Sequence, residues 1–347
     1  MYIEPESILA RRTEAADRRR RIAYIPYEDM GNAYTERMRE LLADFGSVER
    51  FAGVKALLVQ LPRSLRRYDA MVVNWLENAI VAPATGRVSL RGTVRLFLKA
   101  LLMKAFAKRM IFVRHNYHPH GTAAGSEALA RCLVDLYEAL FDVVITHSGA
   151  DADRCYCPHP LYRQSAALPG AGSELQLPEN YFLAFGRIVP YKKIDALVEA
   201  FPSWRALVVA GSVGDAAYAA HIARLRRRNF VFLPGRVDEA EAQRLVRSAR
   251  GIVIANADSD VVVSGTFFYA ISFGCPVYAV ETPFLAWARQ RLGDELLVLE
   301  PDLERLCRMI ATAKPRPVSA ASREAVVREF GDAAVSRALA AALELPR

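Results

Sequence analysis

The sequence predicts an α/β protein with two Rossmann-like domains, each a doubly wound parallel sheet, that face each other across a cleft. Three observations support this fold class. Short apolar runs rich in β-branched residues alternate with helical segments twice along the chain. Continuous apolar strands of this kind are typical of parallel sheets covered by helices on both faces. The length of 347 residues suits two domains of ordinary size.

The expected strands fall into two sets. In the first half they lie at residues 21–27, near 48–52, and at 69–75, 110–115 and 142–148. In the second half they lie at residues 181–186, 205–211, 229–235, 251–256, 276–280 and 295–300. Between the two sets, residues 157–180 are rich in proline, glycine and serine and have no helical or strand periodicity.

We therefore expect an N-terminal domain over residues 1–160, a linker over 161–180 and a second domain over 181–330. A C-terminal helix over residues 331–347 is expected to pack back on the N-terminal domain. Ligands of such sheets bind at the carboxyl ends of the strands, so residues at those ends are the candidates for a functional site.

Composition excludes several classes of protein. A content of 52% hydrophobic and 24% charged residues is typical of a packed globular chain. No run approaches the about 18 apolar residues that a membrane span needs, and the arginines at 18–21 lead into a strand rather than a signal sequence. Five cysteines without framework spacing suit a reducing, cytoplasmic location. Cys155 and Cys157 are too close together for a zinc pair, so we interpret them as structural.

The net charge of +8 is concentrated in residues 87–110, which contain a basic row and an apolar face. The basic row is Arg87, Arg91, Arg95 and Lys99, and the expected apolar face is Val94, Phe97, Leu98, Leu101, Leu102 and Phe106. Such a helix either belongs to the core with a solvated basic edge or docks peripherally on an anionic membrane surface. Nucleic-acid binding is not expected, because no recognition helix, zinc finger or aromatic-basic sheet motif is present.

The sequence "AFGRIVPYKK", residues 184–193, places cations where a strand ends and a helix is expected to begin at Lys192 and Lys193. A helix start carries a partial positive charge and normally attracts acidic residues. Gly186 allows a tight turn, while Arg187 and Lys192 can grip an anion with two phosphates, the first as a fork and the second as a point charge. These three residues predict an anion site.

A second anion-binding element is expected at Ser264, Gly265 and Thr266, which open an apolar helix. Serine is a good N-cap, glycine permits close backbone approach, and the unpaired N–H groups there suit a phosphate. Each element alone has a structural explanation, as a cap or as solvated surface charge. Their combination in one domain favours binding of a diphosphate.

The order G-R-x4-K, then S-G-T and "SFGCPV", resembles the donor domain of GT-B glycosyltransferases, which use nucleotide-diphosphate sugars. With "GNAYTERMRELL", "NWLEN" and "VRHNYHPHG" in the first half, the chain resembles bacterial exopolysaccharide glycosyltransferases related to xanthan-type β-mannosyltransferases. This resemblance, from about residue 22 to residue 300, implies transfer of mannose from GDP-mannose to a lipid-linked oligosaccharide, with no metal and no other cofactor.

One departure concerns the pair of glutamates that the retaining GT-B branch carries, the second of which binds the ribose. Aligning that pattern puts Val261 and Tyr269 at the two positions. Neither side chain accepts a ribose hydroxyl as a carboxylate does. This favours the xanthan-type relatives and leaves the ribose contact unassigned, with Asp258, Asp260 and Glu281 as neighbours.

Sugar transfer with inversion needs a general base for the acceptor hydroxyl. The candidates at first-domain strand ends are Glu77, His115 and His120. Glu77 is preferred, because a carboxylate that follows Trp75 and Leu76 can have a raised pKa. The histidines of "RHNYHPHG" also invite a metal site, but their spacing lacks a carboxylate partner and none is predicted.

Acceptor binding is assigned to Asn32, Tyr34 and Thr35 in the first βα loop, unless Asn32 is simply the helix cap. Two other functions remain open. A nucleotide-sugar 2-epimerase of the same fold binds the same donor without needing the basic helix. A catalytically silent subunit that binds the donor or a partner accounts for the missing glutamates.

Overall fold

The computed structural model describes residues 20–28, 32–59, 61–62, 65–151, 153–163, 177–225, 227–257, 262–315 and 317–344. The chain divides into two compact units. The first unit comprises residues 1–147, 151–157 and 335–347, and the second comprises residues 148–150 and 158–334. Most of the expected linker, residues 164–176, lies outside the described residues.

The first unit is built on a six-stranded parallel sheet in the order β2-β1-β3-β4-β5-β6. Its strands are β1 (Arg20–Ile25), β2 (Gly46–Arg50), β3 (Ala70–Asn74), β4 (Met110–Arg114), β5 (Val143–Thr146) and β6 (Cys155–Tyr156). The order reverses between β1 and β3. From β1 the chain first adds β2 on one side, and it then returns to add β3 and the later strands on the other side. In doubly wound sheets, ligands bind beside such a reversal, at the carboxyl ends of the strands.

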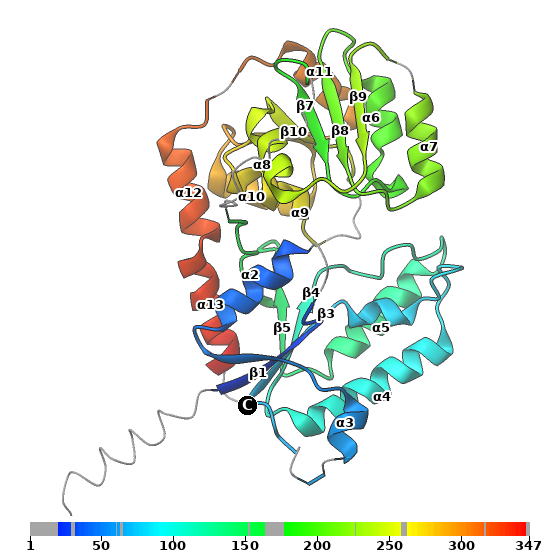
Figure 1. Cartoon of the computed structure of the whole chain (residues 1–347), viewed down its shortest axis with the longest axis vertical. Coiled ribbons are helices and arrows are strands. Elements are labelled where there is room, and N and C mark those ends of the chain that lie inside the picture. Colours follow the sequence, from blue (N-terminus) through cyan, green and yellow to red (C-terminus); the bar gives the residue numbers. More distant parts are fainter. Residues whose placement is uncertain are drawn as a thin grey trace, which may run out of the picture. The chain divides into compact units, whose positions relative to one another are not determined.

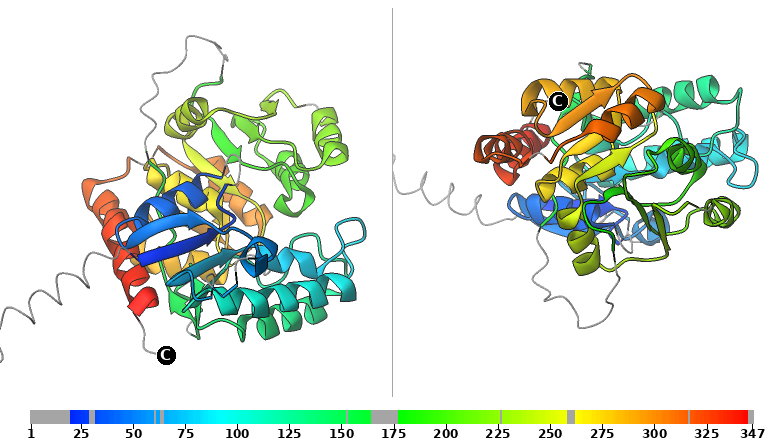
Figure 2. Two further views of the ribbon diagram at one scale, coloured as in Figure 1. Left: turned by 60° about the horizontal axis from the view of Figure 1, so that its bottom comes forward. Right: turned by 90° about the horizontal axis from the view of Figure 1, so that it is seen from above.

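Helices cover both faces of this sheet (Figures 1 and 2). One core joins the sheet to α2 (Ala33–Leu42) and to α13 (Asp332–Glu344), whose Val335, Leu339 and Ala342 are buried against it. The other core joins the sheet to α3 (Val54–Val59), α4 (Leu90–Phe106) and α5 (Glu127–Glu138). A 3-10 helix, η1 (Leu76–Ile80), follows β3 directly. Residues from the end of the chain therefore complete the core of the first unit.

The second unit contains a six-stranded parallel sheet in the order β12-β11-β10-β7-β8-β9. Its strands are β7 (Phe182–Phe185), β8 (Leu207–Gly211), β9 (Phe230–Pro234), β10 (Gly251–Ile254), β11 (Val277–Val280) and β12 (Leu297–Glu300). Counted within the unit, this is the Rossmann order, with the reversal between its first and fourth strands, β7 and β10.

The helices of the second unit are η2 (Pro190–Lys192), α6 (Ile194–Ala200), α7 (Ala216–Arg224), α8 (Glu239–Ser248), α9 (Gly265–Ser272), α10 (Pro283–Leu292), α11 (Leu303–Thr312) and α12 (Ala320–Phe330). Residues of α6, α7 and α11 share one core with the sheet. On the other side, Tyr181 donates to the backbone oxygen of Leu245 in α8 at 2.7 Å. Both sheets are thus all-parallel and covered by helices, which confirms the predicted fold class.

Several local expectations were wrong. The second strand lies at Gly46–Arg50 rather than near 48–52, and the short edge strand β6 was not expected. Lys192 and Lys193 do not begin an α-helix. Lys192 ends the 3-10 turn η2, Lys193 has φ 52°, and α6 begins at Ile194. Pro190 starts η2, and the left-handed residue after it separates this turn from the helix.

The face that α4 buries also differs from the expected one. Phe106 is buried as expected, but the rest of the buried face consists of Thr93, Leu96, Ala100 and Met103. A side chain at Gly92 would place its Cβ 2.1 Å from the backbone oxygen of Ala79, so only glycine permits this approach of α4 to η1. Small residues allow this close packing, and most of the leucine-rich face, for which the sequence left both a core position and membrane docking open, stays outside it.

Candidate functional site

The predicted anion-binding residues of the second unit lie where its strand order reverses. Gly186 to Lys192 follow β7, and Ser264 to Thr266 follow β10, the neighbouring strand on the other side of the reversal. Because the two strands are parallel, their carboxyl ends meet at one edge of the sheet. The fold therefore brings together two segments that are separated by about 75 positions in the sequence, as the residue numbers show.

The backbone oxygen of Phe185 is the meeting point of these two segments. Lys192 donates to this oxygen from Nζ at 3.4 Å, and Thr266 donates from Oγ1 at 3.2 Å. Gly186, with φ +110°, lies directly beneath them, since a Cβ there would lie 2.8 Å from Lys192 Nζ and 3.4 Å from Thr266 Oγ1. Gly186 thus supplies a backbone conformation that other residues rarely adopt and leaves room for the two polar side chains.

Arg187 and Lys192 lie close enough to repel each other. Burial, and to a smaller extent the Arg187 guanidinium, lower the pKa of Lys192 from 10.5 to about 8. Arg187 packs across Gly214, where a Cβ would lie 2.4 Å from its Nε. Within the described part of the chain neither cation has an ion pair with a carboxylate. Two adjacent cations without an acidic partner form a site that an anion would stabilise.

The Ser264-Gly265-Thr266 segment forms the expected helix start. Ser264 is the N-cap of α9, and its hydroxyl accepts from the backbone N–H of Phe267 at 3.4 Å. Among the described residues, a Cβ at Gly265 would have only the Tyr162 hydroxyl within 4 Å, at 3.9 Å. The capping explanation for Ser264 is therefore correct, and Thr266 is the residue of the three whose side chain reaches the cations.

In the first unit, His115 is held at the carboxyl end of β4 by residues that follow β3. Its Nε2 lies 3.0 Å from Oδ1 of the buried Asn74, whose Nδ2 donates to the backbone oxygen of Ile25 at 3.0 Å. The amide orientation makes Asn74 Oδ1 an acceptor, so Nε2 of His115 carries the proton and Nδ1 is the basic nitrogen. Trp75 stacks on the imidazole with ring centroids 4.2 Å apart.

Trp75 has the left-handed backbone conformation, with φ 54°. A bulky residue in this region is an outlier, because its side chain crowds the backbone. Residues held in such conformations cost about 1–3 kcal/mol and cluster at functional sites. Here the left-handed turn directs the chain from β3 into η1 and sets the indole against His115. Neither Asn74 nor Trp75 was predicted as a site residue, although "NWLEN" contains both.

The predicted acceptor residues take part in local structure. Asn32 is the N-cap of α2 and accepts from the backbone N–H of Tyr34 at 3.1 Å. Thr35 donates to the backbone oxygen of Asn32 at 2.8 Å and is 2% exposed. The cap explanation for Asn32 is therefore correct, and acceptor binding by these residues stays a prediction.

The Tyr34 hydroxyl lies 2.8 Å from Nε2 of the buried His147. Nδ1 of His147 lies 2.8 Å from the backbone oxygen of Cys157, which can only accept, so Nδ1 carries the proton and Nε2 accepts from Tyr34. Burial lowers the pKa of His147 to about 4, so this imidazole is neutral at pH 7. His147 orients Tyr34, whose ring packs edge-on against His115 with centroids 5.0 Å apart.

Glu77 has no exposed surface, and neither carboxylate oxygen has a hydrogen-bond partner among the described residues. Burial raises its pKa from 4.5 to about 8, which agrees in direction with the expectation from sequence. General-base catalysis requires direct or water-bridged contact with the substrate proton. A fully buried side chain does not make that contact in this structure, so a catalytic role for Glu77 stays a prediction that its burial disfavours.

Arg114 anchors the loop that carries the other histidines. It is fully buried, ion-paired with Asp135 and Glu138, and it donates to the backbone oxygens of Asn116 and Tyr117. His118 is buried in this loop, and His120 is exposed. An arginine at the end of an apolar strand was the sequence signal that could have identified Arg114 as the anchor of this loop.

Two of the residues considered for the ribose, Asp258 and Asp260, lie outside the described residues, as does Val261. Glu281 is exposed, and its carboxylate lies 3.5 Å from the Arg289 guanidinium. Tyr269 donates to Oε1 of Glu239 at 2.9 Å. The sequence had not indicated Glu239.

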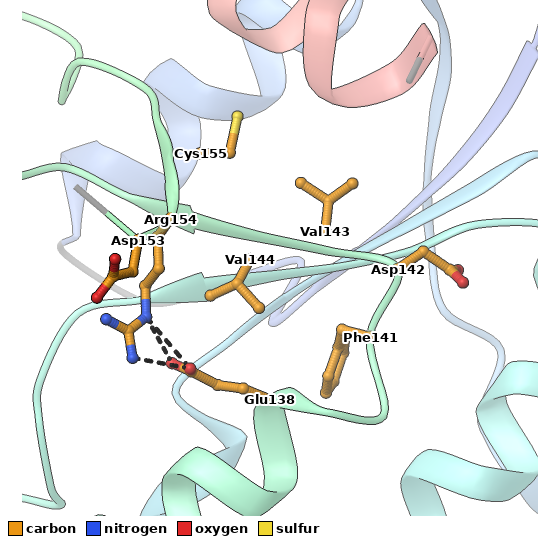
Figure 3. A pocket seen from close by; sticks show the side chains of 8 residues that line it. All are labelled: Glu138, Phe141, Asp142, Val143, Val144, Asp153, Arg154 and Cys155. Carbon is orange, nitrogen blue, oxygen red and sulfur yellow. Dashed lines mark hydrogen bonds and ion pairs between the residues drawn. The ribbon is translucent and has the colours of Figure 1, made fainter. Parts of the chain in front are cut away.

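A pocket of about 380 Å³ in the first unit contains none of the predicted site residues (Figure 3). Ion pairs from Arg154 to Glu138 cross it, and Cys155 borders it. Within the described part of the chain, no group of three or more His, Cys, Asp or Glu residues is arranged to hold a metal ion. Likewise, none of the helices in that part is both long and apolar enough to cross a membrane.

Comparison of the sequence with known proteins gives no match to a family model or to a curated protein. Solved structures with a similar fold do exist. The crystal structure of Anabaena HepE in complex with UDP-glucose has a TM-score of 0.62 and 14% identity, covering 93% of this chain and 99% of that chain. AviGT4, a glycosyltransferase involved in avilamycin A biosynthesis, has a TM-score of 0.54 and 17% identity, covering 93% and 97%.

A third similar structure is a UDP-forming α,α-trehalose-phosphate synthase from Burkholderia vietnamiensis, with a TM-score of 0.58 and 14% identity, covering 90% of this chain and 84% of that chain. At these identities the likeness concerns the fold. The chain consists of two Rossmann-like α/β domains and has the GT-B fold, because it forms two all-parallel six-stranded sheets and matches these three structures over most of their length.

Proposed function

We propose that the protein is a glycosyltransferase that uses a nucleotide-diphosphate sugar as its donor. The observation that carries the proposal is the pair of adjacent cations, Arg187 and Lys192, at the strand-order reversal of the second unit. Gly186 and Thr266 lie next to Lys192, and two adjacent cations suit the charge of a diphosphate. The complex of HepE with UDP-glucose supports this class of donor for a chain of the same fold.

In the proposed reaction, a base removes the proton of an acceptor hydroxyl as its oxygen bonds to the anomeric carbon of the sugar. The bond from that carbon to the diphosphate oxygen breaks, and the nucleoside diphosphate leaves with the electron pair. Arg187 and Lys192 stabilise the negative charge that develops on the leaving group, an effect of the kind that contributes 10²–10³-fold in rate. No metal is assigned a role in this scheme.

Of the three predicted bases, His115 is the one we propose. Asn74 accepts the Nε2 proton of His115, so Nδ1 is the ring nitrogen with the lone pair that would take the proton of the acceptor hydroxyl. His115 is half-buried at a strand end, whereas Glu77 has no accessible atom and His120 lies on an exposed turn. An imidazole has an ordinary pKa close to neutral, which suits a base that must be unprotonated at pH 7.

For the finer identity, we propose mannose from GDP-mannose as the donor sugar and a lipid-linked oligosaccharide of bacterial exopolysaccharide synthesis as the acceptor. These assignments rest on the resemblance of the motifs described from the sequence. The test is calorimetric titration of metal-free protein with GDP, UDP, ADP and TDP. Binding of one nucleotide, lost in Arg187→Ala with the fold intact, supports the donor site, and GDP would support mannose.

If none of the four nucleotides binds to folded protein, the donor-site proposal is wrong, and a scaffold without donor binding takes its place. Turnover of the matching nucleotide sugar by the purified chain then separates the remaining alternatives. Release of nucleotide with sugar transfer excludes a silent subunit. A change in the sugar without transfer would instead identify a nucleotide-sugar 2-epimerase.

We also propose that the first unit docks peripherally on the cytoplasmic face of a membrane. Five apolar side chains of α4 are exposed, namely Leu90, Val94, Leu98, Leu101 and Leu102. Arg91 and Arg95, on the same helix, are exposed as well. From Asn78 to Ser126 the sequence contains no acidic residue, so this surface is complementary to anionic lipid headgroups.

The double variant Leu98→Gln/Leu102→Gln is expected to bind vesicles of anionic phospholipid about 10- to 100-fold more weakly, because each half-exposed leucine contributes about 0.7–1.4 kcal/mol on insertion. Vesicle co-sedimentation measures the effect. The matched control is Leu129→Gln/Leu136→Gln on α5, where two leucines are similarly exposed, at 55% and 54%. Equal loss in both variants, or no binding by the unaltered protein, would contradict membrane docking by α4.

A further inference from the structure

A carboxylate of the second unit, that of Glu239, is held by two hydrogen bonds. Glu239, in the first turn of α8, accepts from the Tyr269 hydroxyl at 2.9 Å and from Nε2 of Gln243 at 2.9 Å, both on Oε1. Burial and the Glu239 carboxylate raise the pKa of Tyr269, so its hydroxyl stays protonated and donates. The carboxylate is thus oriented, although the glutamate is exposed.

Tyr269 links this carboxylate to the anion site through Phe185. The rings of Phe185 and Tyr269 stack with centroids 5.1 Å apart. The backbone oxygen of the same Phe185 receives the hydrogen bonds of Lys192 and Thr266. Thr266 and Tyr269 are three positions apart on α9 and therefore lie on the same side of that helix. Phe185 therefore contacts Tyr269, the partner of Glu239, through its ring, and Lys192 and Thr266 through its backbone oxygen.

Glu239, Arg187 and Lys192 have no ion-pair partners of opposite charge among the described residues. A carboxylate is negatively charged and only accepts hydrogen bonds, so it repels the phosphates that the cations attract and favours hydroxyl groups. A ligand that satisfies both must present negative charge to the cations and, a short distance away, hydroxyl groups to the carboxylate.

We propose that Glu239, positioned by Tyr269 and Gln243, binds a hydroxyl group of the donor nucleotide sugar. Two parts of such a donor carry hydroxyls next to the diphosphate, namely the ribose and the hexose to be transferred. The ribose and the hexose offer the same chemistry to Glu239, and the experiment below distinguishes them. The inference deepens the proposed function, because it assigns a second contact to the same donor.

The experiment compares Glu239→Gln with the unaltered protein by calorimetry, using inorganic pyrophosphate, the nucleoside diphosphate that binds, and the corresponding nucleotide sugar. A hydrogen bond to a charged group is lost, so we expect the affinity for the hydroxyl-bearing ligand to fall about 10- to 100-fold. Pyrophosphate affinity is expected to stay equal or to increase, since a negative charge near its site has been removed. The affinity for the hydroxyl-bearing ligand is thus expected to fall, whereas the affinity for pyrophosphate is not.

Loss of affinity for the nucleoside diphosphate assigns the ribose, and its 2′-deoxy or 3′-deoxy form should then bind the unaltered protein as weakly as the parent nucleotide binds Glu239→Gln. Loss for the nucleotide sugar alone assigns the hexose. Tyr269→Phe, which removes the hydroxyl that orients Oε1, should give a smaller loss with the same ligand pattern. The matched control is Glu241→Gln, on the same helix turn but paired with Arg244.

Equal or stronger binding of all three ligands to Glu239→Gln would overturn the assignment and leave the donor site itself intact. A uniform loss across pyrophosphate, nucleotide and nucleotide sugar would also overturn it, because Glu239 would then act on the site only through folding. Absence of binding by the unaltered protein to pyrophosphate and to every nucleotide would instead refute the proposed function, and the inference with it.

Discussion

Lys192→Met is expected to reduce nucleoside diphosphate binding by two to three orders of magnitude, with no loss of stability. Loss of one partner from a buried, hydrogen-bonded charge pair costs about 2–5 kcal/mol. The unliganded fold depends little on the ammonium group, because its 3.4 Å hydrogen bond to the Phe185 backbone oxygen is opposed by desolvation and by repulsion from Arg187. Methionine keeps an unbranched apolar side chain of similar length, so calorimetry of the variant isolates the charge.

Lys193→Asn is the matched control, because it removes the neighbouring lysine. Lys193 is exposed and has φ 52°, a conformation that asparagine tolerates better than most residues. Its effect on binding should be less than threefold. If both variants lost affinity alike, general positive charge rather than the position of Lys192 would determine binding.

The lowered pKa of Lys192 has a pH signature in the same experiment. At pH 8.5 the ammonium, with a pKa of about 8, is largely deprotonated in the free protein. A bound diphosphate favours the charged form and raises this pKa, so binding takes up a proton in this pH range. The measured enthalpy should vary with the ionisation enthalpy of the buffer, affinity should fall as pH rises above about 8, and Lys192→Met should show neither effect.

The second large effect is expected for Glu77→Gln, and it concerns stability rather than activity. Burial raises the pKa of Glu77 in the folded protein to about 8 from 4.5, so the folded state binds the proton more tightly than the unfolded state. The stability that the protonated carboxyl group contributes is therefore complete below about pH 4.5, and it is lost as the pH rises through about 8.

Glutamine is a neutral replacement of similar shape and removes this pH dependence. Each pKa unit corresponds to about 1.4 kcal/mol, so the stability of Glu77→Gln relative to the unaltered protein should rise by a few kcal/mol between pH 5 and pH 9. Urea unfolding at the two pH values measures the change, and any intrinsic cost of glutamine cancels. The exposed Glu304, changed to glutamine, should show no such rise. A pH-independent difference would mean that Glu77 is hydrated or paired in solution.

Two other buried polar groups lie near Glu77. Thr93 Oγ1 and the Tyr137 hydroxyl lack hydrogen-bond partners among the described residues, and they belong to the helices that pack on η1. The Glu77 carboxylate contributes to the raised pKa of Tyr137, so the two groups lie close together. Buried polar groups are normally hydrogen-bonded, so a protonated Glu77, which can both donate and accept, suits these surroundings better than a carboxylate.

Much of the fold could be predicted, because continuous apolar strands and helical periodicity depend on local sequence. The strand at Gly46–Arg50 was displaced in the prediction because its burial is partial, and β6 was missed because two residues give no periodic signal. The sequence left open whether the leucine-rich face of α4 packs in the core, because its leucines outnumber the small residues that pack. Close approach at Gly92 decided the buried face, and that approach depends on η1, which follows another strand.

The parallel two-sheet class and the two segments that carry Arg187, Lys192 and Thr266 could be read from the sequence alone, because strand ends and turn residues are local features. Which of these side chains meet depends on the tertiary structure. It put β7 beside β10, buried Glu77, fixed the protonated nitrogen of His115 and oriented Glu239 through Tyr269. Strand order, burial and hydrogen-bond direction arise from contacts between distant segments, and a local pattern does not contain them.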